Sequence, residues 1–221
     1  MTPTAPQSAS DLAYGHIRNA ILTGTYEAGA MLGEVRLATE IGVSRTPIRM
    51  ALARLQDEGW VTLYPKRGAL VRGLTDRAVN DLVDVRYVLE STSVLRSTLA
   101  RRAQMLPRLE QQIVQQHAAL READIPAFID STIAFHRSFV EAGENEVMLE
   151  LYDRLADRQR YLLFQLGPRL LDRCDEIIAE HRDLVRRLAD DEPVDFAECL
   201  RGHMMDTSGR AVRPLCIPLP S

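Results

Sequence analysis

Three histidines of this 221-residue chain, His136, His181 and His203, carry the side chains best suited to hold a metal ion. A neutral imidazole is a common ligand for zinc, nickel and related ions. Each histidine falls in a different predicted helix, and helical bundles often build metal sites from inward side chains on facing helices. Their separation along the chain leaves convergence open, so three buried histidines that line a pocket for an organic ligand are an alternative.

Three histidines with an open coordination position are also the layout of a catalytic zinc centre, which makes a metalloenzyme the competing class of function. The sequence holds no matched general base near these histidines and no recognised catalytic motif. We therefore do not expect the chain to be an enzyme.

A second chemical feature is the segment 43–49, which reads Val-Ser-Arg-Thr-Pro-Ile-Arg and predicts the start of a helix. Ser44 or Thr46 can cap the free backbone N–H groups, and the proline that follows is tolerated in a first turn. Arg45 and Arg49 are four residues apart, so both project from one face near the positive end of the helix. Two arginines in this position suit phosphate contacts and the bidentate reading of guanine O6 and N7.

The residues around this helix predict a helix-turn-helix motif followed by a hairpin. Residues 12–22 and 34–41 have the apolar periodicity of short helices, and Gly42 ends the second of them. Residues 59–64 and 69–71 are typical of two strands joined by a turn with a basic tip, that is, a wing.

The wing and the 34–41 helix add further candidate DNA contacts. Lys66 and Arg67 occupy the predicted tip of the wing, and Gly68 would let the backbone approach DNA closely. Arg36 could contact a phosphate group. The predicted DNA-binding set is Arg36, Ser44, Arg45, Thr46, Arg49, Lys66, Arg67 and Gly68.

Charge is distributed unevenly along the chain, whose net charge is −4. Residues 1–74 hold eight Lys or Arg and six Asp or Glu, whereas residues 75–221 hold nineteen and twenty-five. The basic part is the predicted DNA-binding part, and its weak bias favours a homodimer on the two half-sites of a palindromic double-stranded operator. The sequence shows no apolar run of membrane-spanning length and no visible signal peptide, so we expect a cytoplasmic protein. Its three cysteines are scattered along the chain, and we expect them to be free thiols.

From residue 75 onward the sequence predicts successive helices and no strand, so the expected fold class is mainly α. The six expected helices span about 75–104, 107–122, 126–143, 145–165, 168–189, and from the turn at 190–193 to about 212. The predicted parts are a disordered arm at 1–9, a DNA-binding domain at 10–73, a helical domain at 75–212 and a tail at 213–221.

These motifs resemble those of a known family. Residues 10–73 resemble the winged helix-turn-helix domain of GntR-family transcription regulators, on the matching stretches 42–49, 51–52, 55–60 and 66–69. Residues 75–212 resemble the six-helix effector-binding and dimerisation domain called FCD. The residues that carry this second resemblance are Arg86 with Glu90, Phe135 with His136, the helix start at Glu144 and Asn145, Glu180 with His181, and His203.

The resemblance implies a ligand-responsive DNA-binding regulator, a dimeric repressor that a small carboxylate metabolite releases from its operator. It also implies that the three histidines are the family's metal ligands, with Zn or Ni as candidate ions. The aspartate usual in the family four residues before the first histidine is Thr132 here, and Asp130 falls on a different helical face. A carboxylate ligand is therefore expected to be missing, which lowers metal affinity or leaves a metal-independent sensor of organic ligands. Cys199, four residues before His203, is a weaker substitute ligand, because such a cysteine is more often a buried apolar residue.

Arg86, Thr132 and Asn145 are the residues expected to bind the effector. An arginine on an inward helical face can clamp a carboxylate with two hydrogen bonds. The alternative for Arg86 is an i,i+4 pair with Glu90 on a solvated face. The family resemblance favours the effector-binding role.

Overall fold

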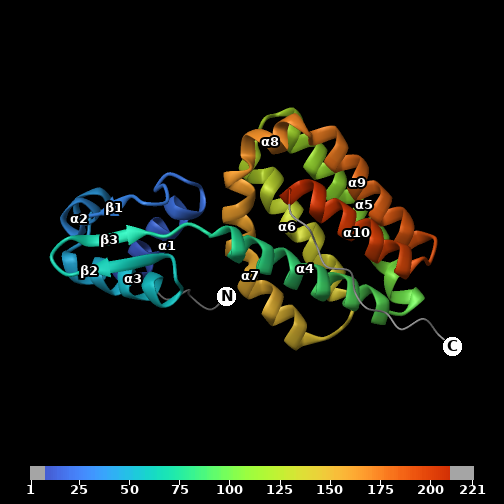
Figure 1. Ribbon diagram of the computed structural model, residues 1–221, viewed down its shortest axis with the longest axis horizontal. Helices are drawn as coiled ribbons and strands as arrows, with labels where there is room; N and C mark the ends of the chain where they lie inside the picture. The colour runs from blue at the N-terminus through green and yellow to red at the C-terminus, as the bar shows by residue number, and fades with distance from the viewer. Residues whose placement is uncertain (1–7, 210–221) are drawn as a thin grey trace, which may run out of the picture. The chain divides into compact units, whose positions relative to one another are not determined.

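The computed structural model describes residues 8–209 and divides into two compact units, Met1–Leu74 and Thr75–Ser221 (Figure 1). The predicted tail at 213–221 and residues 1–7 of the predicted arm lie outside the described residues. The arm prediction is wrong at Ser8 and Ala9, since Ser8 caps helix α1 (Ala9–Leu22) by accepting a hydrogen bond from the backbone N–H of Asp11.

The N-terminal unit contains a helix-turn-helix motif. α2 (Glu34–Ile41) ends at Gly42, which adopts the left-handed conformation, and α3 (Arg45–Asp57) follows after a short turn. α1 packs against α3, and α3 packs against α2. The buried apolar side chains of this unit include Ala13, Ile17, Ile21, Leu37, Ile48, Leu52, Leu55 and Trp60.

Two details of these helices differ from the sequence predictions. Leu12, the first residue of the helix predicted over 12–22 from its apolar periodicity, is 46% exposed, because the buried face of α1 begins at Ala13 and returns at Ile17. Ser44 occupies the N-cap position of α3, but its side chain makes no capping hydrogen bond. Thr46 lies inside the first turn, so neither hydroxyl caps this helix in the way the sequence suggested.

A three-stranded antiparallel sheet provides the wing. Its strands are β1 (Met31–Leu32), β2 (Val61–Tyr64) and β3 (Gly68–Val71), in the spatial order β1-β3-β2. The sequence predicted β2 and β3 but missed β1, because two residues are too few to show an alternating pattern.

Gly68 has a reason within the protein to be glycine. Its φ angle is +110°, and a Cβ atom added there would lie 2.2 Å from the carbonyl oxygen of Leu32. The sequence alone suggests close approach of the backbone to DNA at this glycine. The structure instead shows close approach to strand β1, so a larger residue would separate β1 from β3.

The C-terminal unit is a helical bundle whose described residues form seven helices. They are α4 (Asp76–Arg96), α5 (Leu99–Arg121), α6 (Ile125–Glu141), α7 (Glu146–Gln165), α8 (Gly167–Asp172), α9 (Cys174–Ala189) and α10 (Pro193–Ser208). α6 packs against α4, α5 and α7, while α9 packs against α5 and α10. Phe128, Phe135 and Phe139 of α6 are fully buried and fill the middle of the bundle. In the part of the chain that the structure describes, no helix is long and apolar enough to cross a membrane.

Three helix boundaries in this unit differ from the predictions. The helix expected to reach residue 104 ends at Arg96, because Ser97 is extended and Thr98 caps a new helix that contains Pro107 in its interior. The single fifth helix is divided at Arg173 into α8 and α9. The last helix ends at Ser208 rather than near 212, since Gly209 adopts the left-handed conformation.

Candidate functional site

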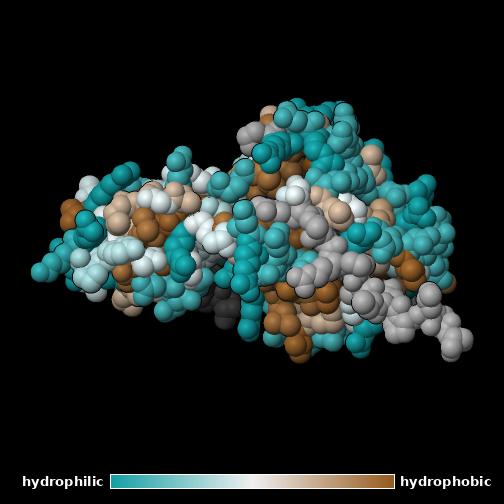
Figure 2. All heavy atoms as spheres, viewed as in Figure 1, coloured by the Kyte–Doolittle hydropathy of each residue, from teal (hydrophilic) through white to brown (hydrophobic). Residues whose placement is uncertain are grey.

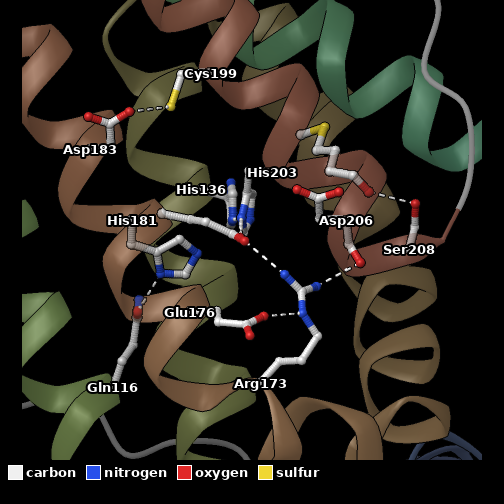
Figure 3. Close-up of polar contacts among 12 residues, drawn as sticks. Gln116, His136, Arg173, Glu176, His181, Asp183, Cys199, His203, Asp206 and Ser208 are labelled. Atoms are coloured by element: carbon white, nitrogen blue, oxygen red, sulfur yellow. Dashed lines mark hydrogen bonds and ion pairs between the residues drawn. The ribbon is translucent and has the colours of Figure 1, made fainter.

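The three histidines come from three helices and meet in the interior of the helical unit (Figure 3). His136 lies on α6, His181 on α9 and His203 on α10, and their exposed fractions are 2%, 0% and 6%. One ring nitrogen of each lies within 4.8 Å of those of the other two, and the Nε2 atoms of His136 and His203 are 3.3 Å apart. The protein thus contains a buried three-histidine cluster that could hold a metal ion.

Each histidine of the cluster has an oxygen acceptor at its Nδ1 atom. The three pairs are His136 with Glu90 at 2.7 Å, His181 with Gln116 at 2.6 Å, and His203 with Glu180 at 2.6 Å. An acceptor at Nδ1 keeps the proton of a neutral ring on that nitrogen and leaves a lone pair on Nε2. Outer-shell partners orient metal-ligating histidines in the same way.

The lone pairs that result point at one another. The Nε2 atoms of His136 and His203 cannot hydrogen bond to each other while both rings are neutral with protons on Nδ1. The Nε2 atom of His181 is buried and has no hydrogen-bond partner among the described residues. A cation between the rings would relieve both problems. Two nitrogens bound at about 2.0–2.1 Å to a tetrahedral zinc ion are about 3.3–3.4 Å apart, so the residues present fit a small divalent ion.

Burial shifts the pKa values of two histidines of this cluster and of the neighbouring Glu90. It lowers the pKa of His136 and the pKa of His181 well below the ordinary histidine value, so both rings are neutral at neutral pH. Metal ions bind this neutral form. Burial also raises the pKa of Glu90 to about 7, against the effect of the Arg86 charge and of a hydrogen bond from Tyr152.

A cavity lies beside the histidine cluster, and most of its lining is apolar. Thr132 lines it one helical turn before His136, and the Oγ1 atom of Thr132 is buried without a hydrogen-bond partner among the described residues. Arg86 also lines the cavity and pairs with Glu90 at 3.0 Å. The side chains of this pair are only 12% and 0% exposed, so the pair does not lie on a solvated face.

Three residues considered from the sequence lie away from the cluster. Asn145 caps α7 by accepting a hydrogen bond from the backbone N–H of Met148, and it does not line the cavity. The expectation that it binds the effector there is thus at odds with its position. Asp130 pairs with Arg160. The thiol of Cys199 donates to Asp183 Oδ2 at 3.2 Å, and Figure 3 shows this pair apart from the three rings.

The side-chain oxygens that orient the three histidine rings could not be identified from the sequence. Glu90 and Glu180 are among the residues that carry the family resemblance, but the sequence assigns neither of them to a histidine, and no motif marks Gln116. Gln116 lies in the C-terminal part of α5, and its Nε2 atom donates to the backbone oxygen of Ser131 at 3.5 Å. Only the packing of α5 against α6 and α9 brings it to His181.

The candidate DNA contacts belong to the N-terminal unit. With the exception of Gly68, which is partly buried, all of them are exposed: Arg36, Ser44, Arg45, Thr46, Arg49, Lys66 and Arg67. Lys66 lies in the turn between β2 and β3 and has a φ angle of 62°. The start of α3 and the tip of the wing therefore both present basic side chains to solvent.

Both units match known families. Residues 9–71 match the family described as bacterial regulatory proteins, gntR family, and residues 81–206 match the FCD domain. An uncharacterised HTH-type transcriptional regulator of Agrobacterium vitis is 31% identical over 131 residues, which cover 58% of this chain and 77% of the relative. The gluconate operon transcriptional repressor of Bacillus licheniformis is 25% identical over 198 residues, covering 88% of this chain and 81% of the repressor.

The fold also has a counterpart among solved structures. A putative GntR transcriptional regulator from Rhodococcus sp. RHA1 superposes with a TM-score of 0.71 at 20% identity, covering 90% of this chain and 95% of that one. The relatives are transcriptional regulators rather than enzymes. The family and the mainly helical fold class inferred from the sequence are thus confirmed. The chain belongs to the GntR family of bacterial regulatory proteins, as a DNA-binding transcription regulator with an FCD domain.

Proposed function

We propose that this regulator is a dimeric repressor that releases its operator when a small carboxylate metabolite binds beside a metal ion in the helical unit. The single observation that carries the proposal is the convergence of His136, His181 and His203, whose Nδ1 atoms each lie 2.6–2.7 Å from a neighbouring side-chain oxygen. A cation between the rings would use the Nε2 lone pairs that this arrangement leaves. Zinc and nickel are the ions proposed, because neutral imidazole suits both.

The effector is proposed to be a carboxylate because of what surrounds the histidines. Arg86 lines the cavity, and its guanidinium group matches the geometry of a carboxylate. Thr132 offers a buried hydroxyl with no hydrogen-bond partner among the described residues. A metal held by three histidines keeps a coordination position open, and a carboxylate could occupy it.

DNA binding is proposed to use both basic parts of the N-terminal unit. Arg45, Thr46 and Arg49 would enter the major groove from the start of α3. Ser44 and Arg36 would contact phosphates, and the wing residues Lys66 and Arg67 would follow the backbone or minor groove.

A dimer is proposed from exposed apolar side chains on α4 and α7, which pack against each other. Val85 and Val88 of α4 are each 46% exposed, and Val147 and Leu151 of α7 are 65% and 47% exposed. Figure 2 shows hydrophobic side chains on the surface where Figure 1 draws α7. Apolar side chains of this kind on adjacent helices favour burial against a second copy, and two copies would read two half-sites.

The test uses full-length protein, first stripped with a chelator and then reloaded with one equivalent of zinc or nickel. The DNA is a duplex that the protein itself selects from a randomised library, and the added ligands are mono-, di- and tricarboxylates. We expect one carboxylate class to weaken binding by about 5- to 150-fold, and only in the reloaded protein. Equal release with and without metal would favour a metal-independent sensor, and no release by any carboxylate would contradict the proposal.

A further inference from the structure

One carboxylate holds both of the arginines at the start of α3. Oε2 of Glu34 accepts a hydrogen bond from Nη2 of Arg45 at 2.8 Å and another from Nε of Arg49 at 2.8 Å. The Glu34 side chain is 25% exposed, whereas those of the two arginines are 56% and 61% exposed. The acid therefore lies beneath two solvent-facing guanidinium groups.

We propose that Glu34 is a positioning residue that sets the DNA sequence preference of this regulator by holding Arg45 and Arg49 in a base-reading orientation. The inference rests on the proposed DNA-reading role of these two arginines. It adds to that role a reason why the arginines would distinguish base edges from phosphates.

The geometry of the bonds supports an orienting role. Arg49 donates to Glu34 through its Nε atom, and within the described residues its Nη1 and Nη2 atoms make no hydrogen bond. A guanidinium that presents two amino groups outward matches the paired acceptors O6 and N7 of guanine. Unrestrained arginine side chains would lose more rotamer freedom on reading a base.

The charge of Glu34 supports discrimination against phosphates. One carboxylate beside two guanidinium groups reduces the local charge of the trio from two to one, and it repels the phosphate oxygens of non-specific DNA. A base edge is uncharged, so reading it does not bring a second negative group towards Glu34. The acid should therefore weaken non-specific binding more than specific binding.

Glu34 is well anchored in its ionised form. It is the first residue of α2, where the positive end of the helix favours a negative charge. The hydrogen bond from Arg45 is the main cause that lowers the pKa of Glu34 below its usual value. The contact thus links the two helices of the helix-turn-helix motif, because Glu34 lies on α2 and both arginines lie on α3.

The test compares full-length wild type with Glu34→Gln, which keeps the size of the side chain and removes its charge. Asp57→Asn is the matched control, because Asp57 is an exposed acid at the end of α3 and its loss changes net charge equally. Arg45→Ala and Arg49→Ala identify which operator positions each arginine reads. All five proteins select duplexes from one randomised library and are then titrated with the selected duplex and with a scrambled duplex.

We expect Glu34→Gln to lose its base preference only at those operator positions where Arg45→Ala or Arg49→Ala also loses base preference. The ratio of selected to scrambled affinity should fall about tenfold. Binding to the scrambled duplex should tighten, with a salt slope steeper by about 0.9 per added phosphate contact. Asp57→Asn should match wild type in all three respects.

Two results would overturn the inference while leaving DNA reading by the arginines intact. One is an unchanged base preference in Glu34→Gln beside a clear loss in Arg45→Ala and Arg49→Ala. The other is an equal effect of Glu34→Gln and Asp57→Asn, which would mean that only net charge matters. If instead neither arginine variant changes the selected sequence, the proposed DNA-reading surface is itself wrong, and the inference falls with it.

Discussion

The Nε2 atoms of His136 and His203 lie 3.3 Å apart, although 67 positions separate the two residues in the chain. Their rings stack with centroids 5.2 Å apart at 19°, between helices α6 and α10. Glu90 and Glu180 accept from the opposite edges of these rings. Two buried lone pairs that face one another in this way are costly unless a proton or cation lies between them.

Replacement of Gln116 by Met should weaken metal binding by about 10- to 100-fold while the bundle stays folded. Methionine has a similar volume but cannot accept the Nδ1 proton of His181, so the ring loses its fixed orientation. Competition with a chromogenic chelator measures the affinity. Gln112→Met is the control, since Gln112 is buried one turn earlier on α5 and contacts Ser138 rather than a histidine. Equal affinities in the two variants would contradict the orienting role of Gln116.

Replacement of Thr132 by Asp should tighten metal binding. Thr132 precedes His136 by one helical turn and lines the same cavity, so a carboxylate there would face the cluster as a fourth ligand. Asp130→Asn, which removes a nearby carboxylate paired with Arg160, should leave the affinity unchanged. Isothermal titration with zinc measures both variants, and an unaltered affinity in Thr132→Asp would mean that position 132 does not face the metal.

The parts of the site that depend on neighbouring residues in the chain could be predicted from the sequence, whereas those that depend on contacts between distant helices could not. The helix that carries Arg45 and Arg49 could be predicted, because the preceding turn and the apolar stripe are local signals. The three histidines could be proposed as ligands only through family resemblance. Gln116 could not be found, because its role arises from the packing of α5 against α9.

The same distinction explains the errors in the fold. Pro107 suggested a helix start, but Thr98 caps the helix earlier and the proline is accommodated in its interior. Gly68 suggested approach to DNA, whereas the nearest obstacle to a side chain is the Leu32 carbonyl oxygen of a strand too short to predict. A competing cap thus sets the start of the helix that contains Pro107, and a tertiary contact explains the glycine at position 68; local composition indicates neither.

Replacement of Lys66 by Gln should weaken binding to selected and scrambled duplexes by the same factor. Lys66 is exposed at the wing tip, and the loss of one phosphate contact should flatten the salt slope by about 0.9. Fluorescence anisotropy across a salt series measures the slope. Arg121→Gln, an equal charge change at an exposed position at the end of α5, should keep the wild-type slope. A change of sequence preference in Lys66→Gln would show that the wing reads bases.

Cys199 should react slowly with iodoacetamide in the folded protein. Burial and its hydrogen bond to Asp183 raise the pKa of the Cys199 thiol to about 12, so the reactive thiolate is scarce at neutral pH. Alkylation should be at least about a hundredfold slower than in urea, and its rate should keep rising with pH above 9. Peptide mass spectrometry follows the reaction, and a rate that levels off near pH 8.5 would be inconsistent with this environment.

The most direct test of the account is the metal content of untagged protein purified without chelators, measured by elemental analysis beside His181→Ala and His117→Ala. His117 is the control, because it lies on α5 outside the cluster. We predict about one zinc or nickel ion per chain in wild type and in His117→Ala, and almost none in folded His181→Ala. Equal metal content in the two histidine variants, or no ion in wild type even after incubation with zinc or nickel, would contradict the metal-dependent account.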